Sequence, residues 1–237
     1  MYGITIARTL MRYSTVGGGL VILFIINGCA VMNTSIMETA ETANPGAIRV
    51  GGEMFVGPDL GNNSFFENSH QNAPLAMWGV GGSLGLDVTK NLECSGKLWV
   101  GSYGISSGTR VQVKYRLPSP IAAIQWAVLP GFNHLSLLSD ANEKPEYAVS
   151  GADIPIVVSW GSESQVLYMA ARYSIDTLTR DFGNESVTLK RVGVLAGISI
   201  RIWKLYIRPE LGYEKVIGHN GISTGGVGLG LEDMQLF

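Results

Sequence analysis

The sequence predicts an all-β protein: an antiparallel up-and-down β-barrel of about 10 strands (about 8 to 12) that spans a membrane. Apolar and polar residues alternate with a period of two from Ala47 onward, and no helical pattern competes. Charged residues make up 15% of the 237-residue chain, against roughly 25% in ordinary globular domains. The chain is nonetheless 46% hydrophobic with 31 glycines. It lacks the run of ~20 apolar residues that a transmembrane helix needs.

The N-terminus is typical of an export signal. Arg8 and Arg12 precede a short apolar run, residues 16–26, which is too short to span a membrane. Ile26-Asn27-Gly28-Cys29 follows and resembles the lipobox of bacterial lipoproteins. The resemblance implies that Cys29 is acylated and becomes the first residue of the mature chain. An ordinary signal peptide with an incidental cysteine is the alternative.

Two further positions bear on this signal. Met1 and Met11 are both candidate starts, since residues 11–28 alone would form a compact lipoprotein signal. By resemblance, Ala30 after the cysteine permits sorting to the outer membrane. The expected domains are a lipoprotein signal peptide (1–28), a lipidated tether (29–45) and the barrel (46–237). With lipid on Cys29, Cys94 has no partner, so we expect no disulfide.

Ten segments carry the strand pattern. They are residues 48–56, 78–88, 92–100, 109–117, 121–129, 154–160, 165–173, 191–202, 203–214 and 227–232. The clearest is Thr109–Leu117, where Val111, Val113 and Tyr115 alternate with Arg110, Gln112, Lys114 and Arg116. The segment 121–129 is apolar on both faces. A strand from 187 to 216 would be about 100 Å long at ~3.3 Å per residue, so we expect a turn at Ile202-Trp203, where the apolar parity switches.

Three patterns favour an apolar exterior over an apolar interior. The other strand face carries Gly, Ser, Arg, Lys and Glu, which suit a narrow lumen. Long connections, at Gly57–Ala73, Pro130–Glu146 and Asp176–Ser186, alternate with shorter ones. Aromatic residues fall near both ends of strands, as in the interfacial girdles of membrane barrels: Trp78, Tyr173 and Tyr213 at one end, and Tyr115, Trp160 and Trp203 at the other. An even strand number places both termini in the periplasm.

From Ala47 to the end, the chain resembles small bacterial outer-membrane β-barrels. Such barrels end in an aromatic residue, here Phe237, although Gln235 and Asp233 depart from the apolar residues favoured before it. The resemblance implies outer-membrane lipid, the lipoprotein-processing machinery and the barrel-insertion machinery as partners. The net charge of −2 indicates no nucleic-acid partner. No cofactor is expected.

A cluster of charges is expected in the lumen. It consists of Glu93, Lys97, Arg110, Lys114, Arg116, Arg172, Arg191, Arg201, Lys204, Arg208, Glu210 and Glu214. Because an unpaired buried ion costs several kcal/mol, these residues are expected to form a salt-bridged, hydrated plug. Basic residues outnumber acidic ones in this set, so a narrow anion-preferring pore is an alternative.

Catalysis and metal binding have little support. His70, His134 and His219 lie in predicted loops without ligand spacing, so no metal site is expected. His134-Leu135-Ser136, with Glu143 or Glu146, is similar to the His-x-Ser arrangement of outer-membrane lipid A deacylases. We expect a non-enzymatic protein with a structural or surface-interaction role through the loops Gly57–Ala73 and Pro130–Glu146. A lipid A-modifying hydrolase and a soluble periplasmic ligand-binding barrel lipoprotein are alternatives.

Overall fold

A computed structural model describes residues 32–33, 36–42, 44–58, 60, 76–101, 106–121, 123–138, 145–180 and 185–235. The expected signal peptide, Cys29, His70, Glu143 and Phe237 lie outside these residues. The strands are β1 (Ala47–Pro58), β2 (Ala76–Thr89), β3 (Leu92–Gly101), β4 (Ser106–Leu117), β5 (Ile124–Val128), β6 (Gly131–Leu138), β7 (Pro145–Gly161), β8 (Gln165–Arg180), β9 (Glu185–Ile202), β10 (Leu205–Val216) and β11 (Gly221–Gln235). The described residues contain no helix that is long and apolar enough to cross a bilayer.

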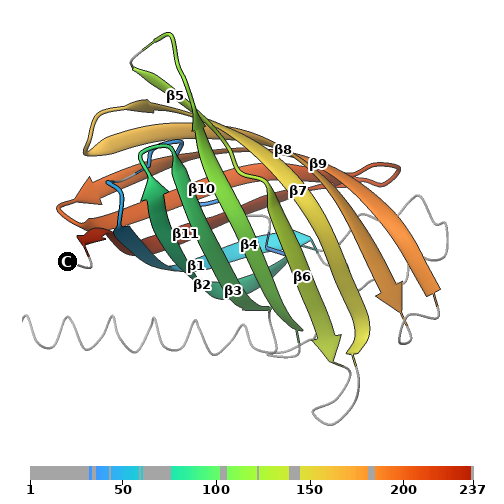
Figure 1. Cartoon of the computed structure of the whole chain (residues 1–237). Helices are drawn as coiled ribbons and strands as arrows, with labels where there is room; N and C mark the ends of the chain where they lie inside the picture. The colour runs from blue at the N-terminus through green and yellow to red at the C-terminus, as the bar shows by residue number, and fades with distance from the viewer. Residues whose placement is uncertain are drawn as a thin grey trace, which may run out of the picture.

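The strands form one closed antiparallel barrel (Figure 1). Sequential strands pair, β1 pairs with β11, and β5 and β6 share one position between β4 and β7. Ten positions therefore surround the lumen, as predicted. We call the end with the connection 59–75 the loop end. The opposite end, with the two-residue turns 90–91 and 203–204, is the turn end. The turn at Trp203-Lys204 lies at the parity switch.

The prediction of a loop at Pro130–Glu146 is wrong over most of that range. Gly131–Leu138 forms β6, and β7 already begins at Pro145. Pro130 marks a break between β5 and β6, which together replace the predicted strand 121–129. Pairing continues across the break, because the carbonyl of Pro130 accepts a hydrogen bond from Val113 N (3.0 Å). A proline that normally indicates a turn here interrupts a single strand position.

The predicted loop Asp176–Ser186 is also shorter in the structure. β8 continues to Arg180 and β9 begins at Glu185. In this extension the pattern inverts, because apolar Leu178 and Leu189 point inward and are 0% and 3% exposed. Outward positions there hold polar residues such as Thr177. Near the loop end the barrel is thus apolar inside and polar outside, as in a soluble barrel. The alternation expected of a membrane strand does not predict this reversal.

Across the remaining height of the barrel, the exterior is apolar and the interior polar. On β4, Val113 is 39% exposed and Lys114 is 0% exposed. Tyr115, Trp160, Trp203, Tyr173 and Tyr213 all face outward and are exposed, while Trp78 is half-buried. This polarity is that of a transmembrane barrel and confirms the predicted fold class.

A row of polar outward side chains borders the apolar exterior on the loop-end side. Its members are directly opposite one another on β4, β6, β7, β8 and β9: Thr109, His134, Ser150, Thr177 and Thr188. Polar side chains are costly against lipid tails, so this row lies at or beyond the edge of the hydrocarbon region. The strand extensions above it project out of the membrane.

Candidate functional site

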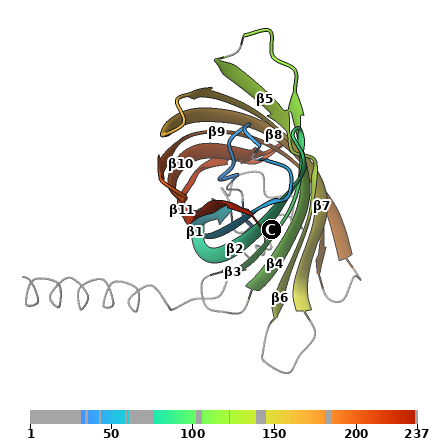
Figure 2. The same cartoon turned by 60° about the vertical axis from the view of Figure 1, so that its left-hand side comes forward.

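The residues that precede β1 run through the inside of the barrel. We call residues 32–42, of which 32–33 and 36–42 are described, the luminal segment. At the loop end, Met32 N donates to the carbonyl of Pro58, the last residue of β1 (3.0 Å). At the turn end, the Thr42 hydroxyl donates to the carbonyl of Lys90 (2.5 Å). The luminal segment therefore crosses the whole lumen, and Figure 2 shows it inside the ring of strands.

Side chains of the wall satisfy the backbone of this segment. The carboxylate of Glu210 accepts hydrogen bonds from Ile36 N (3.1 Å) and Met37 N (2.9 Å). The hydroxyl of Ser159 accepts one from Ala40 N (2.7 Å). Buried backbone groups outside regular structure need such partners, because leaving them unpaired costs about as much as a lost hydrogen bond.

Cationic side chains bind carbonyls of the same segment. Lys97 Nζ donates to Ile36 O and Arg208 donates to Met37 O, each at 2.9 Å. Met37 has a φ of 49°, a left-handed conformation that is uncommon for a residue with a side chain. Its N–H and its carbonyl are both bonded to the wall, and these bonds hold it in that conformation.

Apolar side chains of the segment pack against inward residues. Met32 belongs to a cluster at the loop end that also contains Phe55, Leu60, Trp99, Leu135, Tyr147, Val149, Leu178, Leu189 and Val216. Ile36 and Ala40 belong to a second cluster with Ala127, Leu129, Val157, Tyr168, Ala170 and Leu195. Met37 lies against two glycines of β11. A Cβ at Gly226 would lie 2.6 Å from Met37 Cε, so the absence of a side chain there makes room for the segment.

Glu38 connects the segment to a group of charges near the turn end. Its carboxylate lies 3.4 Å from Arg49 and 3.2 Å from Lys114. Glu93 contacts the same two cations, at 3.2 Å from Arg49 and 2.5 Å from Lys114, and Asp87 lies 3.5 Å from Arg49. All five side chains are buried, so each charge depends on the others.

A second group of charges spans the wall nearer the loop end. Basic and acidic side chains alternate along it in the order Arg110, Asp153, Arg172, Glu214, Arg191, Asp176. The Arg110–Asp153 and Arg191–Asp176 pairs measure 2.6 and 2.7 Å. These side chains come from β4, β7, β8, β9 and β10, so the group links half of the barrel wall from inside.

The structure places most of the predicted luminal charges inside the barrel. Glu93, Lys97, Arg110, Lys114, Arg172, Arg191, Arg208, Glu210 and Glu214 are buried. Arg116 and Arg201 are half-buried at the turn end. Lys204 is not brought into the lumen. It lies in the β9–β10 turn with its Nζ 5.8 Å from the ring centroid of Trp203, because the chain reverses at this point.

Sequence reasoning missed several luminal charges: Glu38, Arg49, Glu53, Asp87, Asp153, Asp176 and Glu232. Most stand at inward positions of strands, so strand parity could have found them. Glu38 lies outside any strand and gives no such signal. Among the described residues, nine acidic and seven basic side chains are buried. The excess of basic residues that suggested an anion-preferring pore is therefore absent from this buried set.

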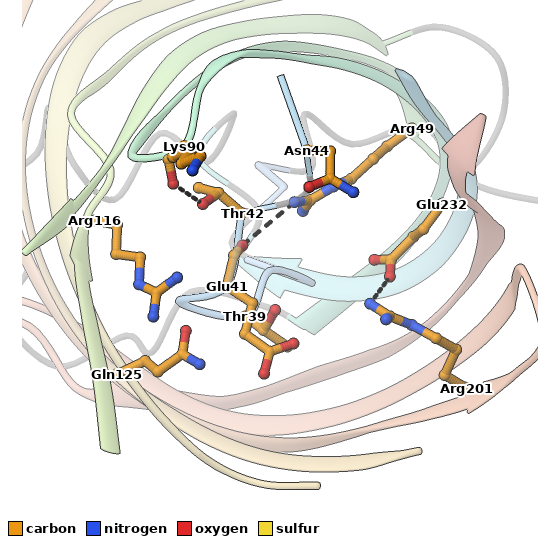
Figure 3. A pocket seen from close by; sticks show the side chains of 10 residues that line it. All are labelled: Thr39, Glu41, Thr42, Asn44, Arg49, Lys90, Arg116, Gln125, Arg201 and Glu232. Atoms are coloured by element: carbon orange, nitrogen blue, oxygen red, sulfur yellow. Dashed lines mark hydrogen bonds and ion pairs between the residues drawn. The ribbon is translucent and has the colours of Figure 1, made fainter. Parts of the chain in front are cut away.

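A polar cavity of about 490 Å³ opens at the turn end (Figure 3). The end of the luminal segment and Asn44 form one side, and strands and turns form the other. The lining residues are Thr39, Glu41, Thr42, Asn44, Arg49, Lys90, Arg116, Gln125, Arg201 and Glu232. Glu232 pairs with both Arg201 and Arg208. Ion pairs of Glu232 therefore form part of the cavity wall.

The His134 and Ser136 pair has a different setting from the expected loop. Both residues lie on β6 and face outward, and His134 Nδ1 contacts Ser150 Oγ at 2.8 Å. Ser136 Oγ contacts Ser107 Oγ at 3.3 Å. Each side chain of the suggested nucleophile–base pair is thus engaged with a neighbouring strand. The described residues contain no group of three or more His, Cys, Asp or Glu that could hold a metal ion.

Comparison with known proteins finds solved structures of similar shape but no family model or curated sequence that matches. Neisserial surface protein A shares 14% identity, with a TM-score of 0.35, over 79% of this chain and 98% of that structure. The N-terminal β-barrel domain of Pseudomonas aeruginosa OprF shares 12% identity, with a TM-score of 0.37, over 80% and 99%. LpxR from Salmonella typhimurium shares 7% identity, with a TM-score of 0.41, over 78% and 99%. At these scores the comparisons assign neither a family nor an activity.

Proposed function

We propose that this chain is an outer-membrane β-barrel lipoprotein, anchored by lipid on Cys29, with a closed lumen and a structural or surface-interaction role instead of catalysis. Outer-membrane lipid, the lipoprotein-processing machinery and the barrel-insertion machinery are the proposed partners. The observation that carries the proposal is the luminal segment, which fills the interior that a pore would need.

The apolar exterior supports residence in a membrane. Exposed Leu, Ile, Val and aromatic side chains cover the outside of the barrel, including Leu98, Val111, Ile154, Met169 and Leu211. A soluble protein rarely exposes a continuous apolar surface larger than a few hundred Å². In a bilayer the same surface contacts lipid tails, and the aromatic rings near the strand ends, such as Tyr115 and Trp160, suit the headgroup regions.

The lumen supports a closed barrel. An eight- to ten-stranded barrel has an interior just wide enough for its own side chains. Here it also holds the luminal segment, two apolar clusters and paired charges. The balance of buried acidic and basic groups removes the argument for a path that selects anions.

The proposal of a non-catalytic role rests on the outward contacts of His134 and Ser136. His134 and Ser136 reach neighbouring serines across β4 and β7 instead of each other. Hydrogen bonds of this kind stabilise adjacent strands where they leave the membrane. A role in strand pairing explains both residues without a catalytic function.

Planar-bilayer recording tests the closed lumen. The full-length protein should give no stable conductance steps, because the luminal segment obstructs the lumen. A variant that lacks residues 32–42 should give discrete openings. Sugar-sized openings in the full-length protein would contradict the proposal.

Metabolic labelling tests the anchor. Cells that express the protein should incorporate a fatty acid analogue into it, and Cys29→Ala should abolish that label. Cys94→Ala is the matched control and should keep the label. Equal labelling of the Cys29→Ala variant and the parent protein would remove the lipoprotein assignment.

A further inference from the structure

We infer that the barrel carries its own N-terminal segment across the membrane, so that the chain preceding Met32, including Cys29, lies at the loop end. This inference rests on the proposed function for the membrane, and on an orientation that we propose with it: the loop end faces outward, as the longer loops of outer-membrane barrels do. An even strand number alone would place both termini at the turn end. Gln235, at the end of β11, does lie at the turn end, whereas Met32 lies at the opposite end.

The direction of the luminal segment follows from its successive contacts with β1. Met32 bonds to Pro58, at the loop end of β1. Asn33 donates to Glu53, in the middle of that strand, and Glu38 pairs with Arg49, near its start. Later residues of the segment thus contact earlier residues of β1. The segment runs antiparallel to β1 inside the barrel, from the loop end to the turn end.

Chain length prevents Cys29 from returning to the turn end. Cys29 precedes Met32 by three residues, which span at most about 11 Å at ~3.6 Å each. β1 has 12 residues, so its length is about 36 Å at ~3.3 Å per step. With a strand tilt of roughly 40°, about 28 Å of that length lies along the barrel axis. Whatever its conformation, the short stretch from Met32 to Cys29 cannot cover this distance.

The lipid on Cys29 therefore belongs to the leaflet at the loop end, which is the outer leaflet in the proposed orientation. The lumen acts as a conduit that the protein's own N-terminal segment occupies. Glu210, Lys97 and Arg208 hold the backbone of the segment, while Arg49 and Lys114 hold Glu38. The partner implied for the N-terminus is the outer lipid surface.

A disulfide tests the path of the segment. A Cβ at Gly228 would lie 3.7 Å from Met37 Cβ, within the ~3.5–4.5 Å that a disulfide requires. In a Cys94→Ala background, Met37→Cys with Gly228→Cys should form a cross-link in cells under mild oxidation. Met37→Cys with Leu229→Cys is the matched control and should form none, because Leu229 faces outward. Heat-modifiable gel migration identifies the folded barrel. Failure of the first pair to cross-link in a folded barrel overturns the inference.

Antibody binding tests the side on which the N-terminus emerges. One epitope is inserted directly before Met32, and another in the connection 118–123 at the turn end. The inference requires that intact cells bind antibody at the first epitope, and that the second needs permeabilised cells. If both epitopes need permeabilisation, the threading is overturned and the proposed barrel orientation stands. If intact cells expose the turn-end epitope, the proposed orientation fails and the outer-leaflet assignment fails with it, while the disulfide still reports the path of the segment.

Discussion

Glu38 and Lys114 form a buried ion pair of 3.2 Å although 76 residues separate them in the chain. Glu38 belongs to the luminal segment and Lys114 to β4, so the pair joins the interior of the barrel to its wall. Arg49 of β1 contacts the same carboxylate. The segment is thereby held at charges from two separate strands.

Removing this carboxylate should weaken the barrel. We expect Glu38→Gln to lower the free energy of unfolding by about 1.5–3 kcal/mol, the range for hydrogen bonds to charged groups. In this variant Lys114 and Arg49 still pair with Glu93, and these pairs limit the loss of stability. Urea unfolding in lipid vesicles measures the difference. Glu41→Gln is the control, because Glu41 is half-buried beside the turn-end cavity, and an equal loss there would contradict the assigned role.

Two arginine pairs of similar length should differ strongly in their contribution to stability. Arg191 lies 2.7 Å from Asp176 with both side chains at most 1% exposed, and Arg180 lies 2.6 Å from Glu185 with 23% and 50% exposed. Removing one partner of a buried pair costs about 3–5 kcal/mol, and an exposed pair contributes about 0–1 kcal/mol. Arg191→Met should therefore lower the unfolding free energy far more than Arg180→Met. Similar losses for the two variants would indicate a well-hydrated lumen.

Cys94 offers a direct test of which face contacts lipid. It is exposed and pairs with outward Val113. In the folded barrel in vesicles, Cys94 should react with a maleimide dissolved in the bilayer and resist a water-soluble one. Lys114→Cys in a Cys94→Ala background should resist the bilayer reagent, because position 114 is buried inside. The reverse pattern at Cys94 would place this face in water.

His134 and Ser136 should be dispensable for lipid chemistry. Expression of the parent protein should leave the mass spectrum of lipid A unchanged, and so should the His134→Ala and Ser136→Ala variants. A mass loss that depends on His134 would instead establish a hydrolase and overturn the non-catalytic proposal.

The period of two is enough to predict the barrel, most of its strand positions and its outward face. Strands such as Thr109–Leu117 follow the simple rule of apolar outside and charged inside. The rule ends where the strands leave the membrane, so the sequence predicts a loop at Leu178, which is apolar and points inward. Pro130 was likewise interpreted as a turn although pairing continues past it.

The candidate site was predictable only in part. The wall charges stand at inward strand positions, and nine of the twelve named from sequence are buried. The luminal segment has no strand period, and its polar contacts with strands are spread over β1, β3, β4, β7 and β10. Most partners of this segment lie far away in the sequence and on several strands, so they leave no local pattern, and the sequence predicts only a tether at residues 29–45.

The closure of β1 on β11 sets an order of assembly. The luminal segment directly precedes β1, and that strand forms one side of the seam that seals the ring. In the proposed lipoprotein, acyl chains attached close to Met32 would be too bulky to pass through an interior that already holds side chains. The open sheet would then have to curl around the segment before β1 and β11 pair. After this closure the lipid would block withdrawal of the segment, and the barrel would remain interlocked with its own N-terminal end.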